Sequence, residues 1–382
     1  MEIWTDGTVV VQAHEETENV RVLRDLAVVG EAKGVKDLGW KTPLAVDVDA
    51  DRIWAGVRLR EFRLSDLTEV ASHEEVVRVA GLGGGRLAAV LPPVDGVCRL
   101  AVGTPGNWER EVVLDDLAAD VLPGLQVTDE EPGSRAIGDD PTLTATEYGL
   151  VVADGRRGVV AHFSPDLRLL GLWMSGGAPE IQQIGYATAR GVLVTAQWAG
   201  RHSDIGWLTS DGARHLRASY GAYALPAGTD RMWLIGDFMV SLLDHEGGIL
   251  SGVPAPNGMI QAAHASGRYC VMATSSEVSV AVPDEGITVR SVRVGGLVNI
   301  VGAFDVDKDH EFPLSLVNEV SKYAVTGGYS SHVGDDGRLH VVVRDVRRGS
   351  GPKVTEALRA EGAVSVSTVT PDGGGQCCSP YA

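Results

Sequence analysis

Positive charge, cysteine and long apolar runs are all scarce in this sequence. Thirty-three Lys and Arg residues stand against 51 Asp and Glu residues, which gives a net charge of −18. Nucleic-acid binding depends on cationic side chains that neutralise phosphates, so we expect no nucleic-acid partner and no attraction to anionic membranes. No apolar run reaches the roughly 18 residues that a transmembrane helix needs. Four cysteines in 382 residues exclude a disulfide framework.

Targeting and catalytic signatures are missing as well. The first residues, MEIWTDGTVV, lack the basic start and the apolar segment of a secretory signal, so we expect a cytoplasmic protein. Every His-Glu pair lacks the second histidine of an HExxH zinc motif, and no GxSxG nucleophile motif occurs. No motif therefore names a reaction, a metal or a cofactor, and whether the protein is an enzyme stays open.

What the sequence does contain is one short recurring pattern, a turn with a small or charged residue followed by an apolar run. Between Arg52 and Arg338 the instances lie about 48 residues apart on average. The clear instances are DRIWAGV from Asp51, GRLAAVL from Gly85, YGLVVAD from Tyr148, RGVLVTA from Arg190, DRMWLIG from Asp230, GRYCVMA from Gly267 and GRLHVVV from Gly337. A looser one, DGTVVVQ, starts at Asp6.

Each instance is followed by further short apolar runs that are separated by turn residues. Asp211-Gly212 and Gly247-Gly248, for example, stand where a hairpin needs positive φ. Short runs that are rich in Val, Leu, Ile and Trp and bounded by turn residues are typical of strands, and helical periodicity is nearly absent. The unit is therefore four short antiparallel strands, and repetition of such a unit at this period is the pattern of a propeller.

The chain resembles the β-propeller superfamily of WD40-like and quinoprotein-like repeats over most of its length. It lacks the Gly-His and Trp-Asp pairs of WD40 repeats and a consistent quinoprotein tryptophan motif, so the resemblance implies a fold and no specific family. We predict an all-β propeller of seven or eight four-stranded blades, with eight favoured by the register count. The ring would be closed by N- and C-terminal strands, with residues 363–369 as the closing strand.

The predicted propeller is a single domain over residues 1–369. It carries two inserts, at about 114–142 and 299–322. The second insert is expected to contain a short helix with Leu316, Val317 and Val320 on one face. Residues 370–382 would form a flexible tail rich in Gly and Cys.

A propeller offers ligand sites at the mouth of its central channel, on inner strands and adjoining loops. On the expected inner strands we predict Tyr186, His264 and His332 as catalytic residues and Asp49, beside Asp47, as a ligand-binding residue. The two histidines either pack beside the channel, or act as metal ligands or as an acid–base pair near physiological pH.

A polar loop, QWAGRHSD, is a second candidate site. It contains Trp198, Arg201, His202 and Asp204, and Arg156 is expected on the same face. An aromatic ring, a guanidinium and an imidazole together suit an anionic or aromatic ligand. The alternative is a loop that is polar only because it is solvated.

The end of the sequence, QCCSPYA, follows three glycines. Cys377 and Cys378 are therefore expected to be exposed, whereas Cys98 and Cys270 fall inside strands and are expected to be buried. Three hypotheses remain for the pair: incidental thiols on an unstructured end, a soft-metal or redox site that two thiolates alone would not complete, or a peptide presented for modification.

Two functions follow from this architecture. The favoured one is a binding scaffold whose channel face docks a partner protein, a peptide or a small ligand, because repetition gives a broad rigid surface. The alternative is a propeller enzyme, a lyase or hydrolase, that uses His, Asp and Arg residues at the channel mouth with or without a divalent metal. A fold alone does not decide between them, and the oligomeric state is not predicted.

Overall fold

The computed structural model divides the chain into two compact units, Met1–Val292 and Arg293–Ala382. It describes all residues except 15–17, 36–37, 39–41, 115–116, 118–136, 138–140, 156–157, 175–180, 199–202, 220–222, 237–238, 256–259, 275–276, 295–296, 306–319, 321–328, 335, 348–349 and 370–382. The division falls inside the single domain predicted over residues 1–369, and the predicted tail lies outside the described residues. No helix among the described residues is long and apolar enough to cross a membrane.

The first unit contains seven four-stranded antiparallel sheets in the described part of the chain, each in simple sequence order. The first is β1 (Glu2–Thr5), β2 (Val9–His14), β3 (Asn19–Arg24) and β4 (Ala27–Ala32). The second is β5 (Leu44–Asp47), β6 (Arg52–Ala55), β7 (Arg58–Arg63) and β8 (Glu69–Glu75). The third is β9 (Arg78–Gly83), β10 (Arg86–Val94), β11 (Val97–Thr104) and β12 (Asn107–Val113).

The remaining sheets repeat this order. The fourth is β13 (Thr142–Thr146), β14 (Gly149–Asp154), β15 (Val159–Phe163) and β16 (Leu169–Met174). The fifth is β17 (Ile181–Thr188), β18 (Gly191–Trp198), β19 (Ser203–Thr209) and β20 (Gly212–Ser219). The sixth is β21 (Tyr223–Pro226), β22 (Arg231–Ile235), β23 (Met239–Asp244) and β24 (Ile249–Pro254). The seventh is β25 (Ala262–Ser266), β26 (Tyr269–Ala273), β27 (Glu277–Pro283) and β28 (Ile287–Arg293).

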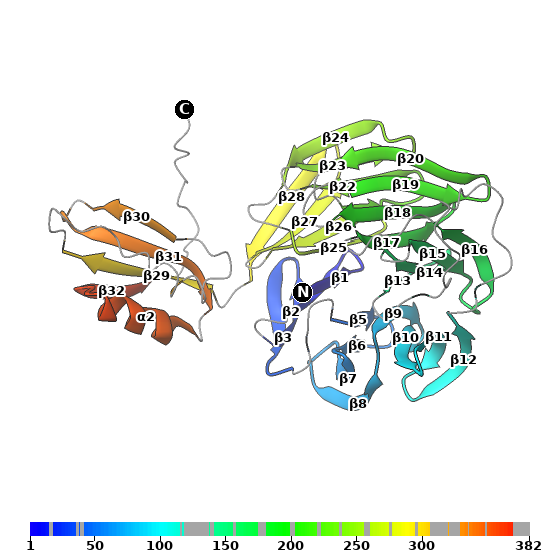
Figure 1. Ribbon diagram of the computed structural model, residues 1–382, viewed down its shortest axis with the longest axis horizontal. Helices are drawn as coiled ribbons and strands as arrows, with labels where there is room; N and C mark the ends of the chain where they lie inside the picture. The colour runs from blue at the N-terminus through cyan, green and yellow to red at the C-terminus, as the bar shows by residue number, and fades with distance from the viewer. Residues whose placement is uncertain are drawn as a thin grey trace. The chain divides into compact units, whose positions relative to one another are not determined.

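The seven sheets are arranged as blades around an axis, with the first strand of each blade innermost (Figure 1). The first strands contact one another all the way round, from β1 through β5, β9, β13, β17 and β21 to β25, and β25 contacts β1. At that last junction the backbone N–H of Thr5 donates a hydrogen bond to His264 Nδ1 at 3.3 Å. The predicted β-propeller is therefore confirmed, and this unit has seven blades.

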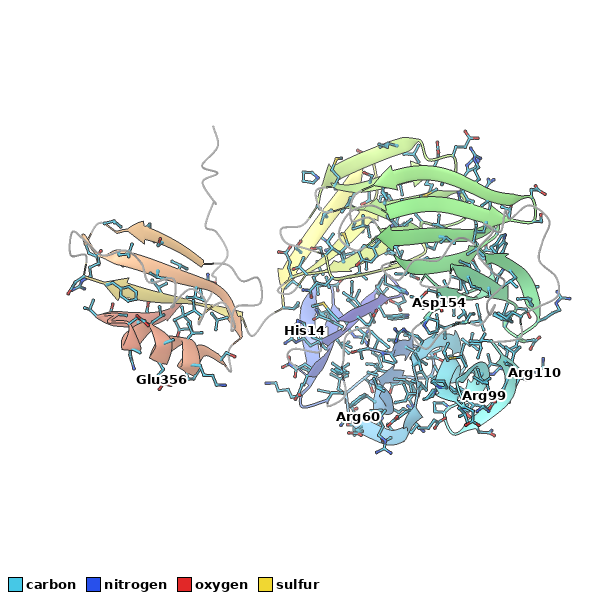
Figure 2. The ribbon with its side chains drawn as sticks, viewed as in Figure 1. His14, Arg60, Arg99, Arg110, Asp154 and Glu356 are labelled. Atoms are coloured by element: carbon cyan, nitrogen blue, oxygen red, sulfur yellow. The ribbon has the colours of Figure 1, made fainter. Side chains whose placement is uncertain are left out.

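Neighbouring blades are held together by apolar clusters that each draw on two sheets. One such cluster joins Val11 and Val22 of the first sheet to Ile53 and Phe62 of the second, and similar clusters join each later pair up to the sixth and seventh. Side chains fill the spaces between the sheets in Figure 2. Of the first predicted insert, the described residues Leu114, Leu117 and Ile137 are buried in the cluster between the third and fourth blades.

The repeat in the sequence has a structural counterpart in the turns and bulges. Thr5 and Thr188 end their inner strands in the same way. The Thr5 hydroxyl donates to the carbonyl oxygen of Val9 at 2.8 Å, and the Thr188 hydroxyl donates to that of Gly191 at 2.9 Å. Each hydroxyl also accepts a backbone N–H of the turn that follows. A register shift also occurs between the third and fourth strands of each of the first six blades. Such bulges twist the outer strand and protect its open edge from pairing with another chain.

The second unit is a different, smaller fold. Its strands are β29 (Leu297–Phe304), β30 (Tyr329–Val333), β31 (Leu339–Arg347) and β32 (Ser365–Val369), in the order β30-β31-β29-β32. Helix α2 (Gly351–Ala360) buries Val354 and Leu358 against this sheet, while Glu356 is exposed on its other side (Figure 2). Val320, expected on the apolar face of the second insert, is buried in the same core.

This unit corrects two expectations. Residues 363–369 were predicted to close the propeller, but β32 pairs antiparallel with β29, and the first sheet contains only β1 to β4. The repeat from Gly337 forms β31 of this helix-backed sheet, so it is no eighth blade of the ring. The count from the sequence included it because a short apolar run after a turn looks the same in any antiparallel sheet.

We expect Gly191→Ala to destabilise the first unit by about 2 kcal/mol or more. Gly191 has φ +130°, and a β-carbon there would lie against the carbonyl oxygen of Leu208. Gly228→Ala is the control, because Gly228 has φ +77° with open space around it, so only the left-handed penalty of about 1 kcal/mol applies. Calorimetric unfolding measures both, and equal losses would contradict the steric explanation.

Candidate functional site

Polar and aromatic side chains gather on the inner strands on one side of the propeller. We call Glu2, Trp4, Tyr186, Tyr223 and His264 the inner-strand cluster. They come from β1, β17, β21 and β25, which belong to the first, fifth, sixth and seventh blades. The rings of Trp4 and His264 lie 6.0 Å apart between centroids. The charge of Glu2 and the phenol of Tyr223 both act on Tyr186, so side chains distant in sequence share one environment.

The strands position these side chains because adjacent residues of a strand point to opposite faces. Ala263 and Ala265 pack into the apolar cluster between the sixth and seventh blades, and His264, between them, points the other way towards β1. Tyr186 and Tyr223 are half-buried at the edge of the same apolar cluster. Their rings are thereby held from one side by core packing.

His264 is a neutral imidazole at pH 7. Its Nδ1 accepts a hydrogen bond from the backbone N–H of Thr5, so the ring proton is on Nε2. Loss of solvation lowers the pKa of His264 to about 4. At neutral pH the ring therefore offers one N–H donor and no charge.

Tyr186 is neutral at the same pH. Burial raises the pKa of its phenol, and the nearby Glu2 carboxylate raises it further. Cys270, on the neighbouring β26, is fully buried, and burial raises the pKa of its thiol as well. The thiol is an inert core group, as expected for a cysteine within a strand.

The inner-strand cluster thus presents neutral donors and aromatic faces beside one carboxylate. General acid–base catalysis works best with pKa values near the working pH, and both His264 and Tyr186 are shifted away from 7. Hydrogen-bond recognition of a ligand has no such requirement. At neutral pH the cluster therefore offers hydrogen-bond donors and aromatic faces, and neither His264 nor Tyr186 titrates near pH 7.

His332, expected with His264 on an inner strand of the propeller, belongs to the second unit. It is on β30 in the second unit, directly opposite His340 of β31. The expected location is therefore corrected, and of the predicted catalytic residues only Tyr186 and His264 lie on inner strands of the propeller. The prediction erred because the repeat around Gly337 was assigned to an eighth blade.

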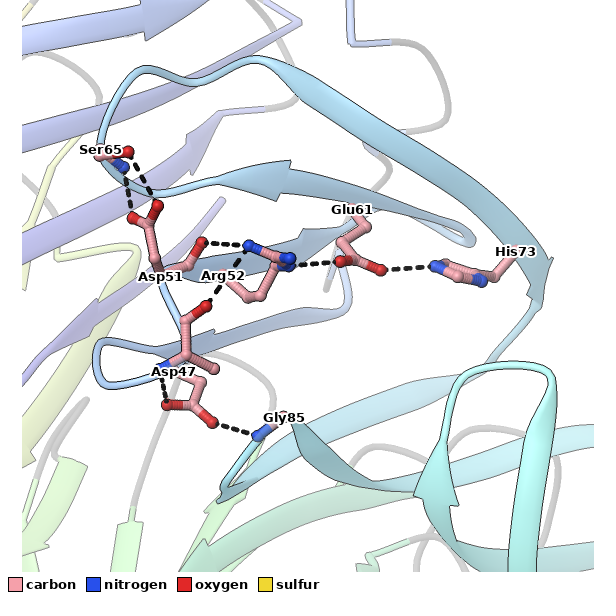
Figure 3. Close-up of polar contacts among 8 residues, drawn as sticks. Asp47, Asp51, Arg52, Glu61, Ser65, His73 and Gly85 are labelled. Atoms are coloured by element: carbon pink, nitrogen blue, oxygen red, sulfur yellow. Dashed lines mark hydrogen bonds and ion pairs between the residues drawn. The ribbon is translucent and has the colours of Figure 1, made fainter.

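The two aspartates of the second blade have different environments. Asp49 is exposed in the turn between β5 and β6. Asp47 is buried, and its carboxylate accepts the backbone N–H groups of Ala50 at 3.0 Å and of Gly85 in the third blade at 2.7 Å. Figure 3 shows Asp47 joining the two blades in this way. Asp47 is therefore a structural residue, whose carboxylate links the second blade to the third.

The same blade contains a chain of polar contacts that crosses its strands (Figure 3). Arg52 Nε donates to Glu61 Oε1 at 2.6 Å, and Glu61 Oε2 contacts His73 Nε2 at 2.8 Å. Arg52 also donates to the carbonyl oxygens of Ala50 and Asp51 in the turn. These groups satisfy one another across β6, β7 and β8, and they stabilise the blade.

The polar loop that the sequence singled out is only partly described. Trp198 ends β18 and Asp204 is on β19, where it pairs with Ala196. Arg156, Arg201 and His202, like Cys377 and Cys378, lie outside the described residues. The ligand-binding roles of these residues stay predictions.

Sequence reasoning missed Glu2, Trp4 and Tyr223. Glu2 and Trp4 precede the loosest instance of the repeat, and Tyr223 opens the very short strand β21. The available signal was their position: each stands on the strand immediately before the repeated turn, which is where Tyr186 and His264 also stand. A rule based on that position would have found them.

Comparison with known proteins supports the fold and no family. No protein-family model and no curated protein matches the sequence. Among solved structures, the chain is similar to a streptogramin B lyase, with 11% identity and a TM-score of 0.50 over 76% of this chain and 93% of that one. It is also similar to the WD40 β-propeller domain of Doa1, with 12% identity and a TM-score of 0.44 over 76% and 91%. The likeness to the streptogramin B lyase structure concerns the β-propeller fold.

Asp47→Ala should destabilise the first unit by about 1–3 kcal/mol, because it leaves the partly buried N–H of Gly85 without its acceptor. Asp49→Ala, two residues away and exposed, should change the free energy of unfolding by less than about 0.5 kcal/mol. Urea unfolding of the two variants tests this. A loss in Asp49→Ala as large as in Asp47→Ala would refute the assignment.

Acid should weaken the first unit through His264. In the unfolded chain the imidazole of His264 has a pKa of 6.5, whereas in the folded protein its pKa is about 4. Between these values the unfolded chain binds a proton that the folded protein does not, so the free energy of unfolding falls as the pH drops from 6.5 towards 4. His264→Gln should remove that part of the pH dependence, since glutamine can still accept the N–H of Thr5. Thermal unfolding of both proteins between pH 7.5 and 4.5 measures the difference, and parallel curves would exclude the depressed pKa.

Proposed function

We propose that the protein is a binding protein whose propeller holds its ligand at the inner-strand cluster. The ligand is a small molecule, or a side chain or terminus presented by a partner peptide or protein. The observation that supports this most is the protonation state of the cluster. His264 and Tyr186 are both neutral at pH 7 and both keep a proton to donate.

The charge of the cluster and of the chain narrows the ligand class. Glu2 brings a carboxylate close to Tyr186, and the chain has a net charge of −18, so an anionic group would be repelled. Trp4 adds an aromatic face, which attracts cations as well as apolar groups. A neutral or cationic group with hydrogen-bond acceptors or an aromatic ring fits this environment best, and nucleic acid fits it worst.

The rigidity of the ring supports binding too. The rings of Tyr186 and Tyr223 rest on core residues, and His264 is fixed by the backbone of β1. Side chains that are already ordered lose little entropy when a ligand arrives. The predicted polar loop at Trp198 and Arg201 would add a second set of contacts for a larger ligand.

A thermal-shift panel of amines, neutral aromatic amides, carboxylates and nucleotides tests the proposal on the full chain. Amines or neutral aromatics should raise the Tm of the first unit, and carboxylates and nucleotides should not. Tyr186→Phe should weaken each hit by about three- to tenfold, the value of one hydrogen bond. Tyr148→Phe, at a tyrosine outside the cluster, is the control and should bind as the wild type does.

Two outcomes would contradict the proposal. If a compound that binds is converted to a product, and Tyr186→Phe or His264→Gln abolishes the conversion, the protein is an enzyme and the alternative function holds. If hits bind equally well to wild type, Tyr186→Phe and Glu2→Gln, the ligand site lies away from the inner-strand cluster.

A further inference from the structure

The second unit contains a pair of histidines facing each other across two strands. His332 of β30 and His340 of β31 are direct partners in the antiparallel register. Their imidazole rings are stacked, with centroids 5.5 Å apart and planes 20° apart. His332 is exposed, and His340 is partly exposed, with a side-chain exposure of 24%. Two imidazoles at this separation, on adjacent rigid strands, can approach one ion together.

A carboxylate fixes the orientation of one ring. His340 Nε2 lies 2.9 Å from Asp336 Oδ1, and this hydrogen bond also lowers the pKa of the Asp336 carboxyl. With its Nε2 proton donated to Asp336, His340 keeps Nδ1 as a free lone pair. Histidines that bind metals almost always donate their other N–H to such a partner, which sets the tautomer and increases the basicity of the ligand.

The hairpin turn around Asp336 is itself held in place. Gly334 N donates to the carbonyl oxygen of Arg338 at 2.9 Å, and Arg338 N donates to Asp336 Oδ1 at 3.1 Å. A β-carbon at Gly334 would come within 2.9 Å of both the His340 ring and the Asp336 carboxylate, so glycine leaves the room that this contact needs. The guanidinium of Arg338 donates to Asp305 at 3.0 Å, and its charge is thereby balanced.

We propose that the His332–His340 pair is a binding site for a divalent late transition-metal ion such as Zn²⁺, with Asp336 as the residue that positions His340. Imidazole nitrogens are ligands that these ions prefer. No group of three or more His, Cys, Asp or Glu side chains is placed to hold a metal among the residues that the structure describes. The pair therefore supplies two protein ligands, and solvent or a bound molecule completes the coordination.

Zn²⁺ titration of the full chain by isothermal calorimetry tests the site. The thiols are first alkylated, so that Cys377 and Cys378 cannot contribute. One saturable ion per chain is expected. His332→Asn and His340→Asn should each lower the affinity more than about tenfold. Asp336→Asn, which weakens the positioning contact and keeps an oxygen acceptor for the backbone N–H of Arg338, should lower it by about tenfold. His245→Asn, at a histidine in the first unit, is the control and should leave the affinity unchanged.

A second readout identifies the ligands directly. In NMR spectra, the imidazole resonances of His332 and His340 should both shift on Zn²⁺ addition, and those of His73, on β8 of the first unit, should not. His332 is exposed, so His332→Asn is expected to fold even if His340→Asn does not. No saturable Zn²⁺ binding, or unchanged affinity in His332→Asn, would overturn the proposal.

Discussion

The structure of the first unit depends on one constraint: each of its sheets is apolar on both faces. Val11 faces the cluster shared with the second blade, and Trp54 and Ile53, neighbours on one strand, face the third and first blades respectively. A sheet of this kind cannot expose either face to water without losing about 25 cal/mol for each Å² of apolar surface. Each such sheet must therefore pack between two other sheets, and a closed ring is the arrangement in which every sheet has a neighbour on both faces. The inner-strand cluster exists because the ring brings the first strands of separate blades together.

The turns and bulges make this arrangement specific. Hydroxyl groups at Thr5 and Thr188 satisfy backbone groups that tight turns between inner and second strands would otherwise leave unpaired. Asp47 does the same for the third blade, at Gly85. Polar residues that are conspicuous in the sequence are thus used in two ways in this fold. Some complete the backbone, and others, such as His264 and Tyr186, lie on the inner strands as neutral groups that each keep a proton at pH 7.

The two candidate sites differ in their physical character. The inner-strand cluster is half-buried, and desolvation lowers the pKa of His264 and raises that of Tyr186, so that neither is charged at pH 7. The His332–His340 pair is on a hairpin of the second unit, where solvent access and a carboxylate favour an imidazole that can share its lone pair. One environment suits hydrogen bonding to an organic ligand, and the other suits a cation. They belong to separate units and use no residue in common.

Local patterning was sufficient to predict the repeated four-stranded unit, the propeller and the buried state of Cys98 and Cys270, because strand alternation and turn residues are encoded over a few positions. It also put Tyr186 and His264 on inner strands.

Tertiary structure alone decided which of the four-stranded sheets belong to the propeller ring. The strands from Leu297 onward have the same local pattern as a blade, yet a helix that buries Val354 and Leu358 covers their sheet. Pairing of β32 with β29 is a long-range choice, set by which faces must be buried, and no short window of sequence contains it.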